Sequence, residues 1–219
     1  LVEPIISSVS ITSTNENPDF AKYRDNLTLS FSTSEPIQDP TDNISVDGLT
    51  NILVVGSDNK TEWTATGQVA SNATGMANYS ISVKDHAGNV ATPVTSTTSI
   101  NLDTGPPFLS EINLVSNNAN DPDAFAKPGD NLTLFFNSTE TLQTPVIILV
   151  DNASVNVVDT SINQDGTSWS AVHFVSSGDP NDNVTFSISY EDNAGNEGAN
   201  RTQDNSSTNS IRIDTGIPE

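Results

Sequence analysis

The sequence repeats itself, and this repeat constrains the fold more than any other feature. The segment YSISVKDHAGN at residues 79–89 returns as FSISYEDNAGN at residues 186–196, and INLDTGPP at residues 100–107 returns as IRIDTGIP at residues 211–218. The distance between equivalent residues grows from 103 to 111 along the chain, which is expected when only loops differ in length. Two copies of one structural unit therefore follow each other in this chain.

The repeat predicts an all-β fold with two tandem immunoglobulin-like β-sandwich domains of about seven strands each. Repeat 1 is expected in residues 1–103 and repeat 2 in residues 104–219. Pro218 matches Pro107, which opens the second copy, so a further repeat is expected to follow. In each copy, short runs of alternating apolar and polar residues are separated by Gly, Pro, Asn and Asp, as in a β-sandwich.

The alternation also places the individual strands. In the first copy they are expected at residues 6–12, 27–33, 44–46, 52–55, 62–68, 79–84 and 97–102. In the second copy they are expected at residues 109–114, 132–138, 146–150, 155–158, 169–175, 184–190 and 209–213.

Charge excludes some partners. The net charge is −21, from 28 acidic residues against seven Lys or Arg, so the chain lacks the clustered cations that bind nucleic acid. The same charge repels anionic membranes, and no apolar run is long enough for direct insertion into a membrane. The acidic charge has two readings. In the first it only keeps a salt-exposed protein soluble, and in the second it also recruits divalent cations. The chain has no cysteine, so no disulfide stabilises it and no thiolate binds a metal.

The ordered motifs resemble a known class of repeat. They are A-K-x-G-D-x-L-T-L-x-F, then S-E, W-x-A, S-I-x-x-x-D-x-A-G-N and I-D-T-x-x-P. This order is similar to the tandem bacterial and archaeal immunoglobulin-like repeats of large cell-surface proteins, such as adhesin stalks and S-layer-type proteins. Two details depart from that pattern: Tyr23-Arg24 stands where the second copy has Pro128-Gly129, and both copies read D-T-G where relatives read D-T-T.

The D-x-A-G-N segments lie between the last two expected strands of each copy. A tight turn with an Asp or Asn side chain that accepts backbone N–H groups explains this segment without any ligand. The alternative is calcium, because the resembled repeats often bind it at their linkers and the topology turns these loops toward the preceding repeat. The expected ligands are Asp103, Glu140, Asp192 and Asn196 at the junction, Glu35, Asp85 and Asn89 toward a preceding repeat, and Asp214 toward a following one.

Other polar features are expected to be structural. The acidic loops at residues 15–19 and 120–123 are explained by solvated turns, with a second ion site as the alternative. Trp63 and Trp169 occupy matching positions and are expected in the cores rather than in a sugar-binding platform. His86 and His173 have no counterparts in the other copy and no second ligand at metal-binding spacing.

Eleven N-x-Ser/Thr sequons are candidate sites for N-glycosylation, if the source organism modifies asparagine. They are Asn26, Asn43, Asn59, Asn72, Asn78, Asn131, Asn137, Asn152, Asn183, Asn200 and Asn205.

These features together predict a structural module rather than an enzyme. No nucleophile turn or Gly-rich phosphate loop is present, so no catalytic residue is assigned. The resemblance implies an extracellular, cell-surface location, with further copies of the repeat in a longer chain and self-assembly or surface neighbours as partners. Repeats that bind a glycan or protein directly are the alternative, although an exposed aromatic patch or an inserted loop is then expected and neither is evident. A third possibility is an accessory domain of a hydrolase.

Overall fold

The computed structural model divides the chain into two compact units, Leu1–Gly105 (unit 1) and Pro106–Glu219 (unit 2). It describes residues 2–96, 100–150, 155, 157–161, 164–203 and 210–216. Each unit is an antiparallel β-sandwich, and the described residues include no apolar helix of the length needed to span a membrane.

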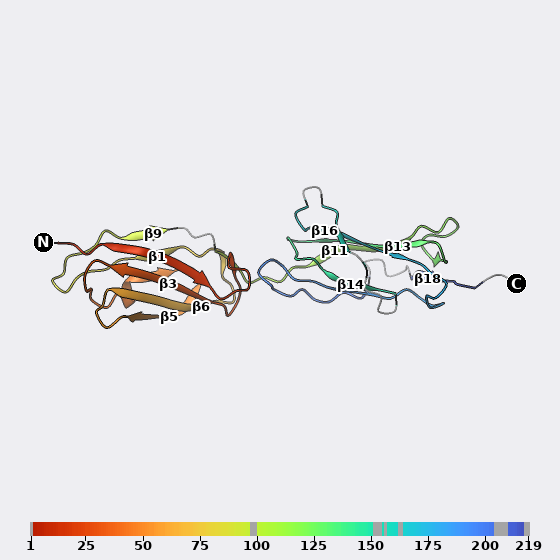
Figure 1. The fold of residues 1–219 in the computed structure, drawn as a ribbon. Helices are drawn as coiled ribbons and strands as arrows, with labels where there is room; N and C mark the ends of the chain where they lie inside the picture. Colours follow the sequence, from red (N-terminus) through yellow and green to blue (C-terminus); the bar gives the residue numbers. More distant parts are fainter. Residues whose placement is uncertain are drawn as a thin grey trace. The chain divides into compact units, whose positions relative to one another are not determined.

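Unit 1 is built around a four-stranded antiparallel sheet whose strands lie side by side (Figure 1). Its order is β1 (Ile6–Ser13), β3 (Asn26–Thr33), β6 (Glu62–Val69) and β5 (Leu49–Gly56). The opposite layer consists of two groups of short strands: β4 (Ile44–Val46), β8 (Tyr79–Ile81) and β9 (Val94–Ser96); and β2 (Phe20–Ala21), β10 (Asn101–Asp103) and β7 (Thr74–Met76).

Unit 2 repeats this plan. Its four-stranded sheet has the order β11 (Leu109–Ser116), β13 (Asn131–Ser138), β16 (Ser168–Phe174) and β15 (Val157–Asp159). The other layer contains the pairs β14 (Val146–Leu149) with β17 (Phe186–Ser189), and β12 (Phe125–Ala126) with β18 (Arg212–Ile213).

Strand order identifies the fold. In sequence letters, each four-stranded sheet reads A-B-E-D, and strands C, F and G form the other layer, which is the arrangement of an immunoglobulin constant-type domain. In both units a two-residue strand after strand A pairs in parallel with strand G, β2 with β10 and β12 with β18. The predicted fold class, two tandem immunoglobulin-like sandwiches, is therefore confirmed.

Alternation along strand B builds each core. Leu27, Leu29 and Phe31 on β3 point inward and are fully buried, while the residues between them are more exposed. Their counterparts on β13 are Leu132, Leu134 and Phe136. Each unit has its own cluster of buried apolar residues, and neither cluster contains a residue of the other unit.

Both tryptophans are buried, as predicted. The indole Nε1–H of Trp63 donates to the carbonyl of Lys60 at 3.1 Å, and that of Trp169 donates to the carbonyl of Gly166 at 2.9 Å. A buried indole needs such a partner, so both rings serve as core residues with a fixed orientation.

The structure differs from the predicted strands where the chain is irregular. Strand D of unit 1 begins at Leu49, three residues before the predicted start at residue 52. A bulge between Thr50 and Leu53 interrupts the alternation of apolar and polar residues there, so the sequence pattern hides the first part of the strand. Strand G of unit 1 is divided into β9 and β10, and residues 97–99 between them lie outside the described residues, as do residues 151–154, 156, 209 and 218 in unit 2. The strands β2, β7 and β12 were missed because two or three residues are too few to show alternation.

The Tyr23-Arg24 departure leaves the turn itself unchanged. Arg24 has a φ of 74°, and its counterpart Gly129 has a φ of 98°. Both backbone N–H groups donate to the equivalent carbonyl at the end of strand E, Arg24 to Val69 and Gly129 to Val175. Unit 1 therefore places a side chain at a position where glycine is the unstrained residue.

Arg24→Gly is therefore expected to stabilise unit 1 by up to about 1 kcal/mol, because it relieves the left-handed backbone. The loss of the Arg24 contact with the Tyr23 ring, 5.0 Å from its centroid, offsets part of this gain. Calorimetry should show a higher melting temperature for unit 1 only. The mirror variant Gly129→Arg should lower that of unit 2, and an unchanged melting temperature in both variants would contradict this explanation.

Candidate functional site

The D-x-A-G-N turn of unit 2 is organised by the carboxylate of Asp192. This residue is only 1% exposed. Its Oδ1 accepts the backbone N–H groups of Ala194 at 2.8 Å and Asn196 at 2.9 Å, and its Oδ2 accepts the side-chain Nδ2 of Asn196 at 2.8 Å. Gly195 takes the left-handed conformation that the turn requires, with a φ of 79°.

Unit 1 has the same turn. Asp85 is buried, and its carboxylate accepts the Asn89 backbone N–H at 2.8 Å and the Asn89 Nδ2 at 2.6 Å. The hydrogen bond from the Asn89 side chain is the largest of the effects that lower the pKa of Asp85, while burial opposes it. In both units the Asp and Asn of this motif therefore hold the turn together by binding each other.

The loop between strands B and C lies against this turn in both units. The side-chain Nε2 of Gln38 donates to the carbonyl of Asp85 at 2.8 Å, and that of Gln143 donates to the carbonyl of Asp192 at 3.1 Å. Each glutamine follows the predicted ligand Glu35 or Glu140 by three residues. Both copies therefore share an E-x-x-Q pattern, which is the sequence signal for this contact.

The backbone around each glutamate is fixed as well. The Thr33 hydroxyl donates to the carbonyl of Glu35 at 2.8 Å, and the Ser138 hydroxyl donates to the carbonyl of Glu140. An isolated bridge then pairs Ile37 with Asp85, and the equivalent bridge in unit 2 pairs Leu142 with Asp192. The glutamate in the loop after strand B is thus presented beside the D-x-A-G-N turn in both copies.

In unit 2 two of the predicted calcium ligands approach each other. A carboxylate oxygen of Glu140 and one of Asp192 lie within 4.8 Å. Two oxygens bound to one Ca²⁺ at about 2.3–2.6 Å are separated by at most about 5.2 Å, so this spacing is compatible with a shared ion. The pair is an acidic cluster that could hold a metal, and Asn196 is joined to it through Asp192.

The aspartates at the ends of strand G adopt a common local structure. Asp103 Oδ1 accepts the N–H of Gly105 at 3.2 Å, and Asp214 Oδ1 accepts the N–H of Gly216 at 2.9 Å. Asp214 also lines a shallow pocket of about 350 Å³ in unit 2, together with Asp121, Phe125 and Lys127. The expected meeting of Asp103 with residues of unit 2 stays a prediction.

The acidic loops after strand A are hydrogen-bonded turns. Asn15 Nδ2 donates to Asp25 Oδ2 at 2.7 Å, and Asn118 Nδ2 donates to Asp130 Oδ2 at the same distance. In each case the backbone N–H of the lysine three residues before the aspartate donates to the same oxygen. These bonds hold the asparagine and the aspartate that the two copies share around each loop in a fixed arrangement.

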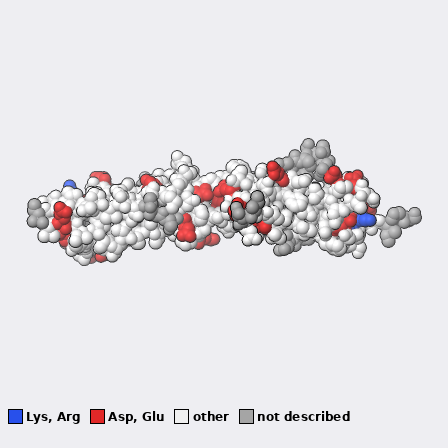
Figure 2. Space-filling model, turned by 90° about the horizontal axis from the view of Figure 1, so that it is seen from above, with Lys and Arg blue, Asp and Glu red and all other residues white. Residues whose placement is uncertain are grey.

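Carboxylates are spread over the visible surface of both units, and Lys or Arg side chains show at few places (Figure 2). One carboxylate of unit 2 has a histidine partner, with His173 Nε2 lying 2.8 Å from Asp179 Oδ2. Burial acts to raise the pKa of Asp179, but hydrogen bonds from His173 and from the Ser176 backbone outweigh it, so the pKa is lowered. This pair was not predicted, because it has no counterpart in unit 1.

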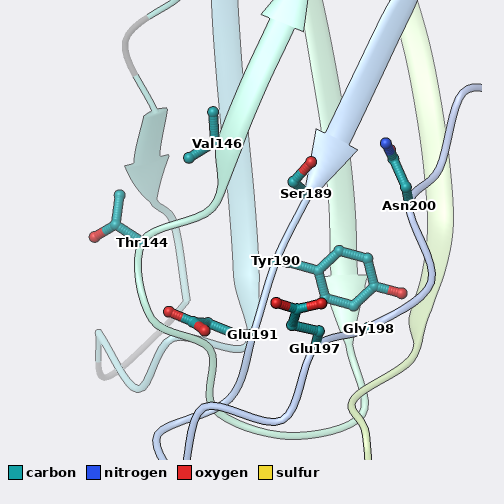
Figure 3. A pocket seen from close by; sticks show the side chains of 8 residues that line it. All are labelled: Thr144, Val146, Ser189, Tyr190, Glu191, Glu197, Gly198 and Asn200. Carbon is teal, nitrogen blue, oxygen red and sulfur yellow. The ribbon is translucent and has the colours of Figure 1, made fainter. Parts of the chain in front are cut away.

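A second shallow pocket of about 350 Å³ lies on the C–F side of unit 2 (Figure 3). The Tyr190 ring is packed against Gly198, where an added β-carbon would lie 2.0 Å from the ring. Burial raises the pKa of the Tyr190 phenol. The pocket is lined by Thr144, Val146, Ser189, Tyr190, Glu191, Glu197, Gly198 and Asn200.

Nine of the predicted glycosylation sites lie among the described residues, and Asn152 and Asn205 lie outside them. The side-chain Nδ2 of Asn78 donates a hydrogen bond to the carboxylate of Asp47, and the Nδ2 of Asn137 donates one to the carboxylate of Glu111. Asn78, Asn131 and Asn137 are partly exposed. The more exposed sites are Asn26, Asn43, Asn59, Asn72, Asn183 and Asn200.

Comparison with known proteins finds no matching family model and no matching curated protein. Among solved structures, the D1–D2 segment of Rst is 11% identical, with 98% of this chain and all of that chain covered and a TM-score of 0.44. The D00–D0 segment of intimin is 10% identical over 93% of this chain and 99% of that chain, with a TM-score of 0.35. Titin domains A168–A170 are 11% identical over 98% of this chain and 66% of that chain, with a TM-score of 0.31.

The TM-scores of these structures are too low to support a fold class, so the fold class depends on the strand order of each unit. On that order the chain is a tandem pair of immunoglobulin-like domains.

Proposed function

We propose that this chain is a structural segment of an extracellular surface protein, in which tandem repeats act as spacer, filament or layer material. The observation that carries the proposal is that each unit completes its own sandwich and its own buried core. A protein built from such units gains length by adding copies, because no copy depends on another for its interior. The motif order shared with repeats of adhesin stalks and S-layer-type proteins supports the same role.

The acidic surface fits this setting. With a net charge of −21 and no cysteine, the chain remains soluble through self-repulsion and needs no oxidative step to fold. The cost is repulsion between neighbouring carboxylates, such as Glu140 and Asp192, which a divalent cation would offset.

We also propose that Glu140 and Asp192 of unit 2 bind a calcium ion. Support comes from the carboxylate oxygens of these two residues, which lie within 4.8 Å of each other, a spacing that one Ca²⁺ can bridge. The loop that carries Glu140 is held in place, since the Phe108 N–H donates to Thr139 Oγ1 at 3.1 Å and the Phe108 carbonyl accepts the Thr139 N–H at 3.0 Å.

The spacer role is tested by deletion of these 219 residues from the gene in the source organism. Electron microscopy should then show a surface structure that is shorter by two units, while attachment of the cells to their ligands is retained. Unchanged dimensions with lost attachment would contradict the spacer role and favour direct ligand binding.

A further inference from the structure

The outer face of the four-stranded sheet differs between the two units. In unit 2, Phe135 on β13 and Val172 and Phe174 on β16 point away from the core, with exposed fractions of 43%, 47% and 62%. None of these side chains is charged, in a chain with a net charge of −21. This outer aromatic face was not expected from the sequence, in which Phe135 and Phe136 are adjacent and only the strand register decides which one is buried.

Unit 1 shows that the fold does not require such a face. The positions equivalent to Phe135, Val172 and Phe174 are Ser30, Thr66 and Gln68, because the register of β3 with β6 matches that of β13 with β16. These polar residues interact with their own neighbours, as in the hydrogen bond of 3.0 Å between the hydroxyls of Thr28 and Thr66. The edge strand β5 of unit 1 does expose Leu53 and Val55, at 66% and 52%, so the feature that sets unit 2 apart is its exposed aromatic rings on this face.

A glycosylation sequon crosses the outer aromatic face. Asn131 lies directly opposite Phe174 in the sheet, and Thr133 of the same sequon lies opposite Val172. Side chains in such cross-strand pairs start about 4.5–5.5 Å apart, so a group attached to Asn131 begins beside the Phe174 ring. Among the described residues the Asn131 side-chain amide has no hydrogen-bond partner, whereas the Asn137 amide on the same strand donates to Glu111 at 2.5 Å.

We propose that Asn131 carries an N-linked oligosaccharide whose first sugar packs on Phe174 and Val172. One face of a pyranose ring presents mainly C–H groups, which suit the flat surface of an aromatic ring, while its hydroxyls remain in water. The sugar thus covers apolar area that would otherwise promote association. At the matching sequon of unit 1, Asn26 lies opposite Gln68, so a sugar attached there finds no aromatic surface.

The modification is an ordinary transfer reaction. A new bond forms between Asn131 Nδ2 and the anomeric carbon of the first sugar, and the bond from that carbon to the phosphate oxygen of a lipid-linked oligosaccharide donor breaks. The amide nitrogen loses one proton to the transferase or to water, and the lipid phosphate or diphosphate leaves. The proposal requires that the chain meets such a transferase, but it does not depend on calcium or on the spacer role.

The test begins with the complete protein purified from its source organism. Peptide mass spectrometry should find Asn131 modified. In this glycosylated form, Asn131→Gln should lower the melting temperature of unit 2 by several degrees, whereas Asn26→Gln should leave that of unit 1 unchanged. In the Phe174→Ser background, loss of the Asn131 glycan should have little further effect, because the surface on which it packs has been removed.

Several results would overturn the proposal. An unmodified Asn131 would do so directly, and concentration-dependent dimerisation abolished by Phe174→Ser would then assign the outer aromatic face to a second copy of the chain. If Asn131 is modified but Asn131→Gln lowers the melting temperature equally with Phe174 present and in the Phe174→Ser background, the glycan does not pack on this ring. NMR contacts between sugar protons and the Phe174 ring provide a readout that does not depend on stability.

Discussion

Phe136→Ala is expected to destabilise unit 2 by about 3–5 kcal/mol while unit 1 keeps its full stability. The Phe136 side chain is 1% exposed and belongs to the core cluster of unit 2, so its removal leaves a cavity inside that cluster. Against a typical total stability of about 5–15 kcal/mol, this loss is large. No residue of unit 1 belongs to that cluster.

Calorimetry of the whole chain provides the measurement. One of two transitions should move down by roughly 10–25 °C, and the other should stay in place. Phe31→Ala, the matched change in unit 1, should move the other transition. Phe135→Ser alters the exposed neighbour and serves as the control, with an expected change within about 0.5 kcal/mol when no glycan is attached. A single transition that moves as a whole with either core variant would show that the units fold as one body.

Calcium is expected to stabilise unit 2 through Glu140 and Asp192. At a free concentration about 100 times the dissociation constant, binding to the folded state adds about 2.7 kcal/mol. Glu140→Gln should abolish most of this increase and the binding heat in titration calorimetry, because an amide oxygen replaces a carboxylate ligand.

The repeat offers a matched control for the calcium experiment. Glu35→Gln removes the equivalent carboxylate from unit 1 and should leave calcium binding by Glu140 and Asp192 unchanged. Equal effects of Glu35→Gln and Glu140→Gln would indicate general attraction of cations to an acidic surface. A titration with no heat at millimolar calcium would contradict calcium binding by Glu140 and Asp192 while leaving the spacer role in place.

Much of the fold was predictable because strand B and strand E alternate clearly. The run NLTL in both copies places Leu27 and Leu29, or Leu132 and Leu134, on one face, and the fold class followed from the repeat length and turn spacing. What could not be read from the sequence are the two-residue strands β2 and β12, whose pairing with strand G is fixed by distant residues. The bulges in strand A, at Ser8 and Glu111, likewise depend on pairing rather than composition.

The candidate site was predictable in part for the same reason. Comparing the two copies identified Asp85 and Asp192 as equivalent, and the need of a tight turn for a side-chain acceptor explained their role. The approach of Glu140 to Asp192 followed from topology. The His173–Asp179 pair and the outer aromatic face could not be found this way, because each belongs to one copy only and therefore leaves no mark in the repeat.

The most direct test of two self-sufficient units compares the whole chain with its two halves, residues 1–105 and residues 106–219, produced separately. Each half is expected to fold alone, with an amide NMR spectrum that superimposes on that of the whole chain except for residues near the junction. An unfolded spectrum for either half would contradict this expectation, because that half would then need the other to complete its core.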